Sequence, residues 1–427
     1  MSAVARHILS DTARVTPAGR LEVGGRDVAH LADDFGTPLF VYDEEHLRAR
    51  CREAVRAFGT DSVIYATKAF LCVAMARLAH EEGLLLDVAT GGEMHVALAA
   101  GVPAERLVVH GNNKSRDELE RAMHIGVRHV VVDSFDEMDR IDALVARGAP
   151  RIRVQIRVTP GVYVHTHEYI STGQNDSKFG FNLGNGDALR AVQRAKRSDS
   201  MEFIGIHCHI GSNVFDADNF TRAAGVMVQF ANETESAELT LGGGLGVAYV
   251  NDEVAPTITE WAAALRAGTS TLRHGVRVLV EPGRAIVAAA ALTAYRVGTV
   301  KDIPGVRTYV SVDGGMSDNP RPVLYGSGYE AFLPARATAS RDRTVRLVGK
   351  HCESGDVLIS ESRVPADIAV GDVVATPVTG AYGHSMGSNY NKVPRPAVVF
   401  VRDGAARLVV RRETYDDLLR QDVTDSV

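Results

Sequence analysis

Short apolar runs alternate with amphipathic segments over the first two thirds of the chain. Eight such runs occur, at 63–68, 84–90, 106–111, 129–134, 152–158, 203–210, 239–244 and 276–283. The segments between them, such as 92–100 and 115–125, have helix-like sequence. Nearly continuous apolar strands alternating with helices indicate a parallel sheet that is covered on both faces. Eight units in roughly 250 residues fit a (β/α)8 barrel better than an open doubly wound sheet.

Almost every apolar run ends in a reactive or glycine-rich position. These ends are Lys68, Asp87, His110, Asp133, Arg157, His207 with His209, Gly242 to Gly244, and Glu281 with Arg284. A stabilising core would not need charge at the same end of strand after strand. In (β/α)8 barrels the active site lies at the carboxyl ends of the strands, so the pattern predicts a catalytic mouth there.

The pattern changes after about residue 287. Short alternating segments, punctuated by Gly and Pro, occur at 293–299, 307–312, 345–349, 373–378, 397–402 and 407–411. Such segments are typical of antiparallel sheets. We therefore expect a barrel over 39–286 and a β-sandwich or barrel-like domain over 287–427, with 1–38 packing on the second domain. Within this scheme the extended segment 38–42 is expected to join the β domain before a helix at 44–58.

Composition and charge exclude several classes of protein. The 427 residues are 45% hydrophobic and 23% charged, with a net charge of −6, which is ordinary for a soluble globular protein. Clustered Lys and Arg, the footprint of nucleic-acid binding, are absent from the sequence. No apolar run reaches the roughly 18 residues of a membrane helix, and the N-terminus lacks a signal-peptide core. The four cysteines are scattered without metal-type pairing, so we expect a reduced, cytoplasmic protein.

Lys68 ends the apolar, β-branched run 63–67. Dehydrating an ammonium is expensive, but burial lowers the pKa of a lysine, and a neutral ε-amine can form a Schiff base with an aldehyde. The run therefore predicts a buried lysine that holds pyridoxal phosphate, with a solvated strand-end lysine as the alternative. Lys114 and Lys178 compete for this role. We expect Lys114 to be solvated or to start a helix, and Lys178 to pair with a carboxylate.

Ten motifs, in order along the chain, resemble those of the diaminopimelate decarboxylases. They are YATKA at 65–69, DVATGGE at 87–93, HGNNKS at 110–115, SKFG at 177–180, HCHIGS at 207–212, GGGLG at 242–246, EPGRAIV at 281–287, DGGMSDNPRP at 313–322, CESGD at 352–356 and GAYGHSMGSNYN at 380–391. The resemblance implies an α/β fold: a pyridoxal-phosphate-binding (β/α)8 barrel, similar to alanine racemases (fold type III), with a C-terminal antiparallel β domain. It also implies decarboxylation of meso-2,6-diaminopimelate to L-lysine and CO2, the last step of lysine biosynthesis. The last three motifs favour this branch over the ornithine decarboxylases.

The resemblance gives cofactor roles to residues at the strand ends. Lys68 matches the lysine that holds pyridoxal phosphate, Asp87 a carboxylate near it, and His209 the side chain that stacks on the ring. Glu281 matches the acid beside the pyridine nitrogen, where a carboxylate favours the pyridinium and thus the better electron sink. The phosphate and its surroundings are expected to contact Gly242, Gly243, Gly244, Ser212, Arg284 and Tyr382. Taken alone, the triple glycine also fits a flexible turn, and Glu281 a surface position.

A substrate with an amino acid group at each end needs a clamp for the distal carboxylate. The arginine fork binds carboxylates bidentately, and Arg284 and Arg321 match the arginines that do so in the family. Tyr325 and Tyr382 are expected beside them, and Glu353 is expected to receive the distal ammonium.

Cys352 is the candidate proton donor, with an ordinary small buried cysteine as the alternative. In the family its segment reaches the cofactor of the other subunit, so the resemblance implies a homodimer with a shared active site. The expected partners are thus an amino acid substrate and a second copy of the chain, with no nucleic acid and no membrane.

Metal binding is a further possibility that the sequence raises. His207 and His209 lie on the same side of a strand, and His165 stands two residues from His167. A zinc site also needs a third ligand and further supporting groups, and no matching Cys/His spacing supplies them. We therefore expect no metal.

Other functions remain open on the sequence alone. The segment 383–391 keeps the family pattern, but His384 and Gly387 are expected to reshape the edge of the pocket, which leaves the substrate scope undecided. The nearest alternative is a decarboxylase of ornithine, arginine or another diamino acid. A non-catalytic pyridoxal-phosphate-binding homologue is disfavoured because Lys68 and Cys352 are both present, and a racemase is disfavoured because CESGD fits decarboxylases better.

Overall fold

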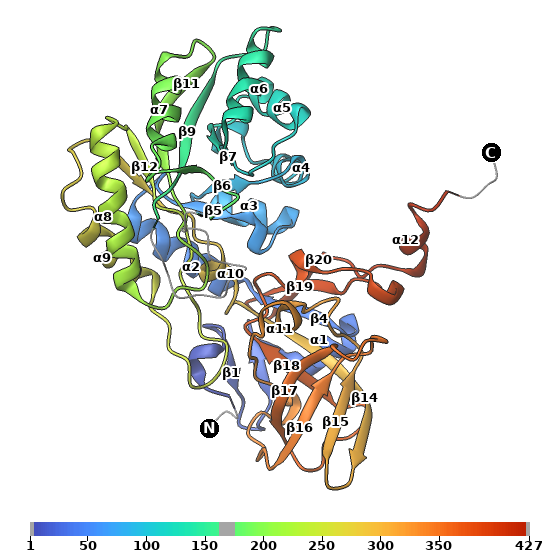
Figure 1. Cartoon of the computed structure of the whole chain (residues 1–427). Helices are drawn as coiled ribbons and strands as arrows, with labels where there is room; N and C mark the ends of the chain where they lie inside the picture. The colour runs from blue at the N-terminus through green and yellow to red at the C-terminus, as the bar shows by residue number, and fades with distance from the viewer. Residues whose placement is uncertain (1–3, 162–175, 424–427) are drawn as a thin grey trace. The chain divides into compact units, whose positions relative to one another are not determined.

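The computed structural model describes residues 4–161 and 176–423 (Figure 1). The chain forms two compact units. The barrel unit comprises Arg50–Val247 and Ala255–Ala285, and the β unit comprises Met1–Ala49, Ala248–Val254 and Ile286–Val427.

Eight parallel strands form the sheet of the barrel unit in its described part. They are β5 (Ile64–Ala66), β6 (Leu85–Val88), β7 (Leu107–Val109), β8 (His129–Val132), β9 (Ile152–Thr159), β11 (Met201–His207), β12 (Glu238–Thr240) and β13 (Arg277–Leu279). They pair in chain order, and a parallel bridge between Val63 and Val280 brings the first strand to the last. A short strand, β10 (Phe181–Asn182), adds to β9. The predicted (β/α)8 barrel is therefore confirmed.

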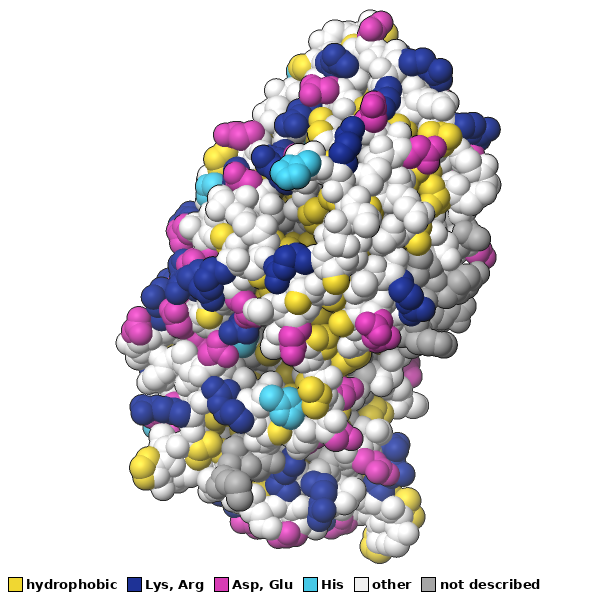
Figure 2. Space-filling view, turned by 90° about the vertical axis from the view of Figure 1, so that its left-hand side faces the viewer, with side chains coloured by type: hydrophobic (Ala, Val, Ile, Leu, Met, Phe, Trp, Pro, Cys, Tyr) yellow, Lys and Arg dark blue, Asp and Glu magenta, His cyan; other side chains and the backbone are white. Residues whose placement is uncertain are grey.

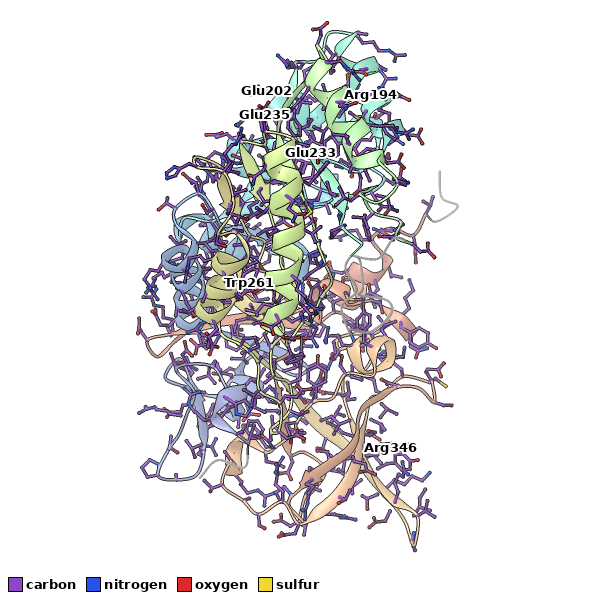
Figure 3. The ribbon with its side chains drawn as sticks, turned by 60° about the vertical axis from the view of Figure 1, so that its left-hand side comes forward. Arg194, Glu202, Glu233, Glu235, Trp261 and Arg346 are labelled. Carbon is purple, nitrogen blue, oxygen red and sulfur yellow. The ribbon has the colours of Figure 1, made fainter. Side chains whose placement is uncertain are left out.

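Helices follow the strands and cover the barrel (Figure 1). They are α2 (Glu44–Phe58), α3 (Val73–Glu81), α4 (Gly91–Ala99), α5 (Arg116–Ile125), α6 (Phe135–Val145), α7 (Asp187–Arg197), α8 (Ala217–Glu233), α9 (Ile258–Gly268) and α10 (Arg284–Val287). Trp261 of α9 is fully buried and packs edge-on against Phe220 of α8 and Phe58 of α2 (Figure 3). Such aromatic contacts hold the helices α2, α8 and α9 together.

Three consecutive helices begin with the same local signal. Thr90, Ser115 and Ser134 each accept a hydrogen bond from the backbone N–H three residues later, at Glu93, Glu118 and Glu137. A hydroxyl at the N-cap followed by Glu at the third helical position stabilises a helix start. Because Thr90 and Ser134 come two residues after β6 and β8, these caps fix the point where the chain leaves the carboxyl end of the barrel, whereas Ser115 follows β7 after the loop 110–114.

The β unit contains a mainly antiparallel sheet. Its strands are β4 (Leu39–Asp43), β14 (Ala291–Ile303), β15 (Arg307–Val312), β16 (Arg343–Val348), β17 (Val357–Val364), β18 (Val373–Pro377), β19 (Ala397–Arg402) and β20 (Ala405–Val410). The order is β17-β16-β15-β14-β4-β19-β20, with β18 also paired to β14. A small sheet of β1 (Arg14–Val15), β2 (Leu21–Val23) and β3 (Arg26–Asp27), with the helices α1 (Val28–Phe35), α11 (Arg321–Tyr325) and α12 (Tyr415–Leu419), completes this unit.

Strand β4 lies in the β unit, as expected for the segment 38–42, although the barrel domain was expected to begin at residue 39. It is buried at all five positions and lies between β14 and β19, so it belongs to the β unit, and the barrel unit begins at Arg50. A strand with sheet neighbours on both sides and both faces covered is apolar throughout, which makes it resemble a barrel strand in sequence.

The surface carries mixed charge. Lys and Arg lie among Asp and Glu over the face shown in Figure 2. Within 4–161 and 176–423, no helix combines the length and the apolar character that crossing a membrane requires.

Candidate active site

Lys68 lies at the carboxyl end of β5. The strand ends at Ala66, and a 3-10 turn over Thr67–Ala69 follows, fixed by a 2.6 Å hydrogen bond from Thr67 Oγ1 to the carbonyl of Asp87. Thr67 and Ala69 are buried, whereas Lys68 is exposed. The predicted burial of this amine is therefore wrong, because the turn carries the side chain past the buried strand to the rim.

The charge of Lys68 nevertheless acts on its neighbours. Burial raises the pKa of Asp87 and of Glu93, and the ammonium of Lys68 opposes both shifts. Lys68 and Asp87 thus share one electrostatic environment at the ends of two adjacent strands.

The two competing lysines have other surroundings. Lys114 is buried, and its Nζ donates three hydrogen bonds of 2.7 Å, to the carbonyls of Gly111 and Val131 and to Glu137 Oε1. Of the two roles expected for Lys114, the solvated one is wrong, because its ammonium pairs with a buried carboxylate, whereas its place just before the N-cap Ser115 of α5 fits the helix-start role. All three of its N–H groups are engaged in structural bonds. Lys178 is exposed, with its Nζ 5.1 Å from the centre of the Phe179 ring.

Glu281 follows the last barrel strand and is buried between two histidines. His207 Nε2 lies 2.9 Å from Glu281 Oε2 in a hydrogen bond. His110 Nε2 lies 3.0 Å from Glu281 Oε1, at ion-pair distance, and among the described residues neither buried atom has a hydrogen-bond partner. His110 Nε2 is also 4.0 Å from Asp87 Oδ1.

The protonation states in this cluster follow from burial and charge. Burial lowers the pKa of His207 to about 4, so its imidazole is neutral near neutral pH. Burial also opposes charge on His110, but Asp87 and Glu281 raise its pKa above the ordinary value. For Glu281, burial favours the acid form, yet His207 and His110 hold its pKa well below the usual range. Glu281 is therefore a carboxylate with one acceptor oxygen, Oε1, that makes no hydrogen bond.

The triple glycine forms a tightly packed loop beside Glu281. A β-carbon on Gly242, Gly243 or Gly244 would come within 2.6, 2.1 or 2.2 Å of the carbonyls of Cys208, Glu281 and Gly211, respectively. Glycine is therefore required here by close backbone approach, in addition to the phosphate contact that the sequence predicted.

His209 and Ser212 lie against this loop. The backbone N–H of Gly243 donates to His209 Nδ1 at 3.4 Å, and the bond from Val214 N to the Gly244 carbonyl holds the Ser212 segment beside the glycines. Arg284 is buried at the start of α10, three residues after Glu281. The structure thus brings the cofactor residues predicted on the barrel to one end of it.

Two further residues at this end were not assigned a role from the sequence. They are His110, described above, and Arg157, which is buried with its guanidinium 4.4 Å from the centre of the Phe179 ring and 3.7 Å from Asp133 Oδ2. Both stand at the ends of predicted strands. Their position at strand ends is the signal that the sequence offers for a role in the site. Only the closed barrel shows that His110 faces Glu281.

His110, His207 and Glu281 are also a possible metal site, because their ligand atoms lie within 4.8 Å of one another. The sequence had instead paired His207 with His209, while His165 and His167 fall outside the described residues. A cation here would occupy the Glu281 oxygen that a pyridinium nitrogen would use, so the two roles exclude each other.

The remaining predicted site residues belong to the β unit, where three motifs converge. Asp356 accepts hydrogen bonds from the backbone N–H of Met316 at 2.7 Å and of His351 at 2.9 Å. Asn391 Oδ1 accepts from the N–H of Cys352 at 3.0 Å. The buried Asp356 and the exposed Asn391 therefore hold the backbone around Cys352, joining DGGMSD, CESGD and the end of GAYGHSMGSNYN.

The side chains of Cys352 and Glu353 are exposed on this anchored segment. The alternative of Cys352 as a buried packing residue is therefore wrong. Tyr382 adopts the left-handed backbone conformation, with φ of +60°. Such a conformation is costly for a tyrosine and is found preferentially at functional sites.

His384 and Gly387, expected to shape the edge of the pocket, both have close neighbours within the β unit. The His384 ring meets Phe40 edge-on at 5.9 Å, and burial lowers its pKa to about 4. A β-carbon on Gly387 would lie 3.1 Å from the carbonyl of Ser317.

Comparison with known proteins places the chain in a family. A family model described as pyridoxal-dependent decarboxylase, pyridoxal binding domain, matches residues 44–288. Diaminopimelate decarboxylase of Bacillus subtilis is 46% identical, covering 97% of this chain and 98% of that protein. The corresponding protein of Mycobacterium tuberculosis is 48% identical, covering 94% of each. The chain belongs to the diaminopimelate decarboxylase family.

Solved structures agree with this assignment. Diaminopimelate decarboxylase of M. jannaschii superposes with a TM-score of 0.91 at 32% identity, covering 98% of this chain and 99% of that one. The same enzyme has been solved with L-lysine. A lysine/ornithine decarboxylase from Vibrio vulnificus shares the fold, with a TM-score of 0.76 at 22% identity, covering 88% of this chain and 97% of that one.

Pyridoxal phosphate is the cofactor of this family. The residues present fit it, because Glu281 offers a buried carboxylate oxygen without a hydrogen bond, and the glycine loop leaves no room for side chains.

Proposed function

We propose that the protein is a pyridoxal-phosphate-dependent carboxy-lyase that converts meso-2,6-diaminopimelate to L-lysine and CO2, the last step of lysine biosynthesis. One observation separates this substrate from a diamine-forming reaction. Arg321 is a buried cation, and its hydrogen-bond partners within the described residues are the hydroxyl groups of Tyr329 and Ser327, with no carboxylate at ion-pair distance. An unpaired buried charge is expensive unless a ligand of opposite charge completes the site.

Pyridoxal phosphate supplies the electron sink for breaking the bond between Cα and the carboxylate. The protein's role is to hold the cofactor and to adjust its electronic properties. Lys68 provides the amine for covalent attachment, and Glu281 Oε1 offers the acceptor for the protonated ring nitrogen. Neutral His207 keeps the Glu281 carboxylate in place through its 2.9 Å hydrogen bond. Asp87 sets the local charge near Lys68, and His209 would support the cofactor ring by stacking on it.

The phosphate is assigned to the loop Gly242, Gly243 and Gly244, with Ser212 and Tyr382. Loops with close backbone approach and exposed amides suit phosphate oxygens.

The substrate's distal end is assigned to residues with matching charge. We assign the carboxylate that remains on the product to Arg321, and we assign Arg284, Tyr325 and Tyr382 to substrate binding as well. Glu353 carries the negative charge that receives the distal ammonium. A fork of N–H groups discriminates against ornithine, because ornithine has no distal carboxylate to fill it.

We also propose a homodimer in which Cys352 returns the proton to the site of the partner copy. The support is that Cys352 and Glu353 are exposed in the single chain while their backbone is firmly anchored. A thiol acting as proton donor must stay reduced, which suits a cytoplasmic enzyme.

Release of CO2 from a panel of amino acids tests the substrate. The purified holoenzyme should act on meso-diaminopimelate, with kcat/KM for ornithine, arginine and lysine lower by on the order of 10³-fold or more, because the buried fork would be left unfilled. Turnover of ornithine or arginine without diaminopimelate would overturn the assignment. Epimerisation of diaminopimelate without CO2 would indicate a racemase.

Mixing two inactive variants tests the shared site. Lys68→Ala and Cys352→Ala chains, unfolded and refolded together in equal amounts, should regain about a quarter of wild-type activity, because half of the dimers would carry one intact site. Each variant refolded alone is the control and should stay inactive. No regain, with dimers present by light scattering, would contradict a site built from two chains.

A further inference from the structure

Arg321 is held by hydroxyl groups and aromatic rings of the β unit. Its Nε donates to Tyr329 Oη at 3.0 Å, and its Nη2 donates to Ser327 Oγ at 2.9 Å. The guanidinium carbon lies 4.7 Å from the centre of the Tyr249 ring and 5.6 Å from that of Tyr325. Two directional bonds and two ring faces therefore restrict the plane and the rotation of the fork.

Tyr249 reaches Arg321 through an excursion of the chain. Residues Ala248–Val254 stand in sequence between β12 and α9 of the barrel, yet they belong to the β unit. The Tyr249 ring meets the Tyr329 ring edge-on, with centres 5.4 Å apart. The backbone N–H of Asn251 donates to Glu330 Oε1 at 3.3 Å, and Asn251 Oδ1 accepts from Ala5 N at 2.7 Å. These contacts fix the excursion to the segment that carries Tyr329.

The bonds to Tyr329 and Ser327 use only part of the guanidinium. A guanidinium has five N–H groups, and these two bonds use the one on Nε and one on Nη2. Two on Nη1 and one on Nη2 remain, which is enough for a bidentate bond to a carboxylate. Burial opposes the charge, but Tyr249 and Tyr329 raise the pKa of Arg321, so the fork stays protonated.

We propose that Tyr329, Ser327 and Tyr249 are positioning residues that aim Arg321 at the distal carboxylate and thereby select amino acids over diamines. The proposal rests on the proposed function, in which Arg321 binds that carboxylate. Tyr329 is the main determinant because it bonds to Nε, the atom that sets the orientation of the whole plane. Ser327 fixes the second nitrogen on the same edge, and Tyr249 supports the face. A guanidinium held in this way loses little conformational freedom when it binds the distal carboxylate. This favours both the affinity for amino acids and their discrimination from diamines.

Binding of two ligands to the holoenzyme tests this role. L-lysine carries the carboxylate that decarboxylation leaves behind, and 1,5-diaminopentane is the same chain without it. Titration calorimetry should show that Tyr329→Phe weakens L-lysine on the order of tenfold, which is the effect of losing one hydrogen bond to a charged group. The Kd of the diamine should change by less than about twofold, because it makes no contact that depends on the fork.

Kinetics and a matched variant separate positioning from general damage. For diaminopimelate, KM should rise by a similar factor in Tyr329→Phe while kcat changes little, because binding rather than chemistry is affected. Tyr309→Phe removes a hydroxyl from β15 of the same unit and should leave both affinities unchanged. Ser327→Ala should weaken L-lysine in the same direction, and it is the variant to use if Tyr329→Phe does not fold.

Equal weakening of both ligands by Tyr329→Phe, or an unchanged affinity for L-lysine, would overturn the positioning role. If the wild-type holoenzyme shows no preference for L-lysine over the diamine, the proposed function itself fails. The two failures are therefore distinguishable.

Discussion

Lys68→Ala is expected to lose decarboxylase activity by on the order of 10³-fold or more, the scale at which removal of a covalent catalytic group acts. The purified variant should also lack the visible absorbance that the wild type shows with its cofactor. The reason is that Lys68 supplies the amine at the rim of the barrel, while the buried Lys114 already uses its three N–H groups. Activity assays and an absorbance spectrum measure both effects.

Lys196→Ala is the matched control, because Lys196 is an exposed lysine on α7 of the same unit. It should keep both colour and activity. A Lys68→Ala enzyme with full activity would defeat the proposed mechanism, and a colourless wild type that does not respond to added pyridoxal phosphate would defeat the cofactor assignment.

Glu281→Gln is expected to lower kcat by about 10²-fold to 10³-fold, comparable with the loss of one preorganised electrostatic contact in an active site. The amide has the same shape but no charge, so it stabilises a protonated ring nitrogen less well. The variant should still bind the cofactor at Lys68 and keep a visible absorbance band. This separates loss of electronic tuning from loss of the cofactor.

Glu202→Gln is the control for this change. Glu202 lies on β11, the strand that carries His207, but its side chain is exposed at the far end (Figure 3). The Glu202→Gln variant should leave kcat unchanged. Because the pKa of Glu281 is held well below the usual range, its protonation should not contribute to any loss of activity in mildly acidic buffer. A Glu281→Gln enzyme with wild-type kcat would contradict the assigned role.

The barrel could be predicted because each strand is a short, continuous apolar run with a helix signal after it. The caps at Thr90, Ser115 and Ser134 show how local this information is. Strand β4 was expected in the β domain because it precedes the helix at 44–58, although its uniform burial gives it the apolar pattern of a barrel strand. The excursion that brings Tyr249 to Arg321 has no local signal, because it depends on contacts with residues some eighty positions later.

The candidate site could be predicted in part for a related reason. Strand ends gave the reactive positions, and the family motifs gave their roles. The exposure of Lys68 depends on a 3-10 turn, and the burial of Lys114 depends on Glu137, which lies 23 residues later in the chain. His110 can face Glu281 only because the first and last strands meet, and only the closed barrel brings them together.

The most direct test of the account is to reduce the purified holoenzyme with borohydride, digest it and map the pyridoxyl group by mass spectrometry. The account predicts that the group lies on the peptide containing Lys68 and on no other lysine. A pyridoxyl group on Lys114 or Lys178, or a protein that carries none after incubation with pyridoxal phosphate, would contradict it.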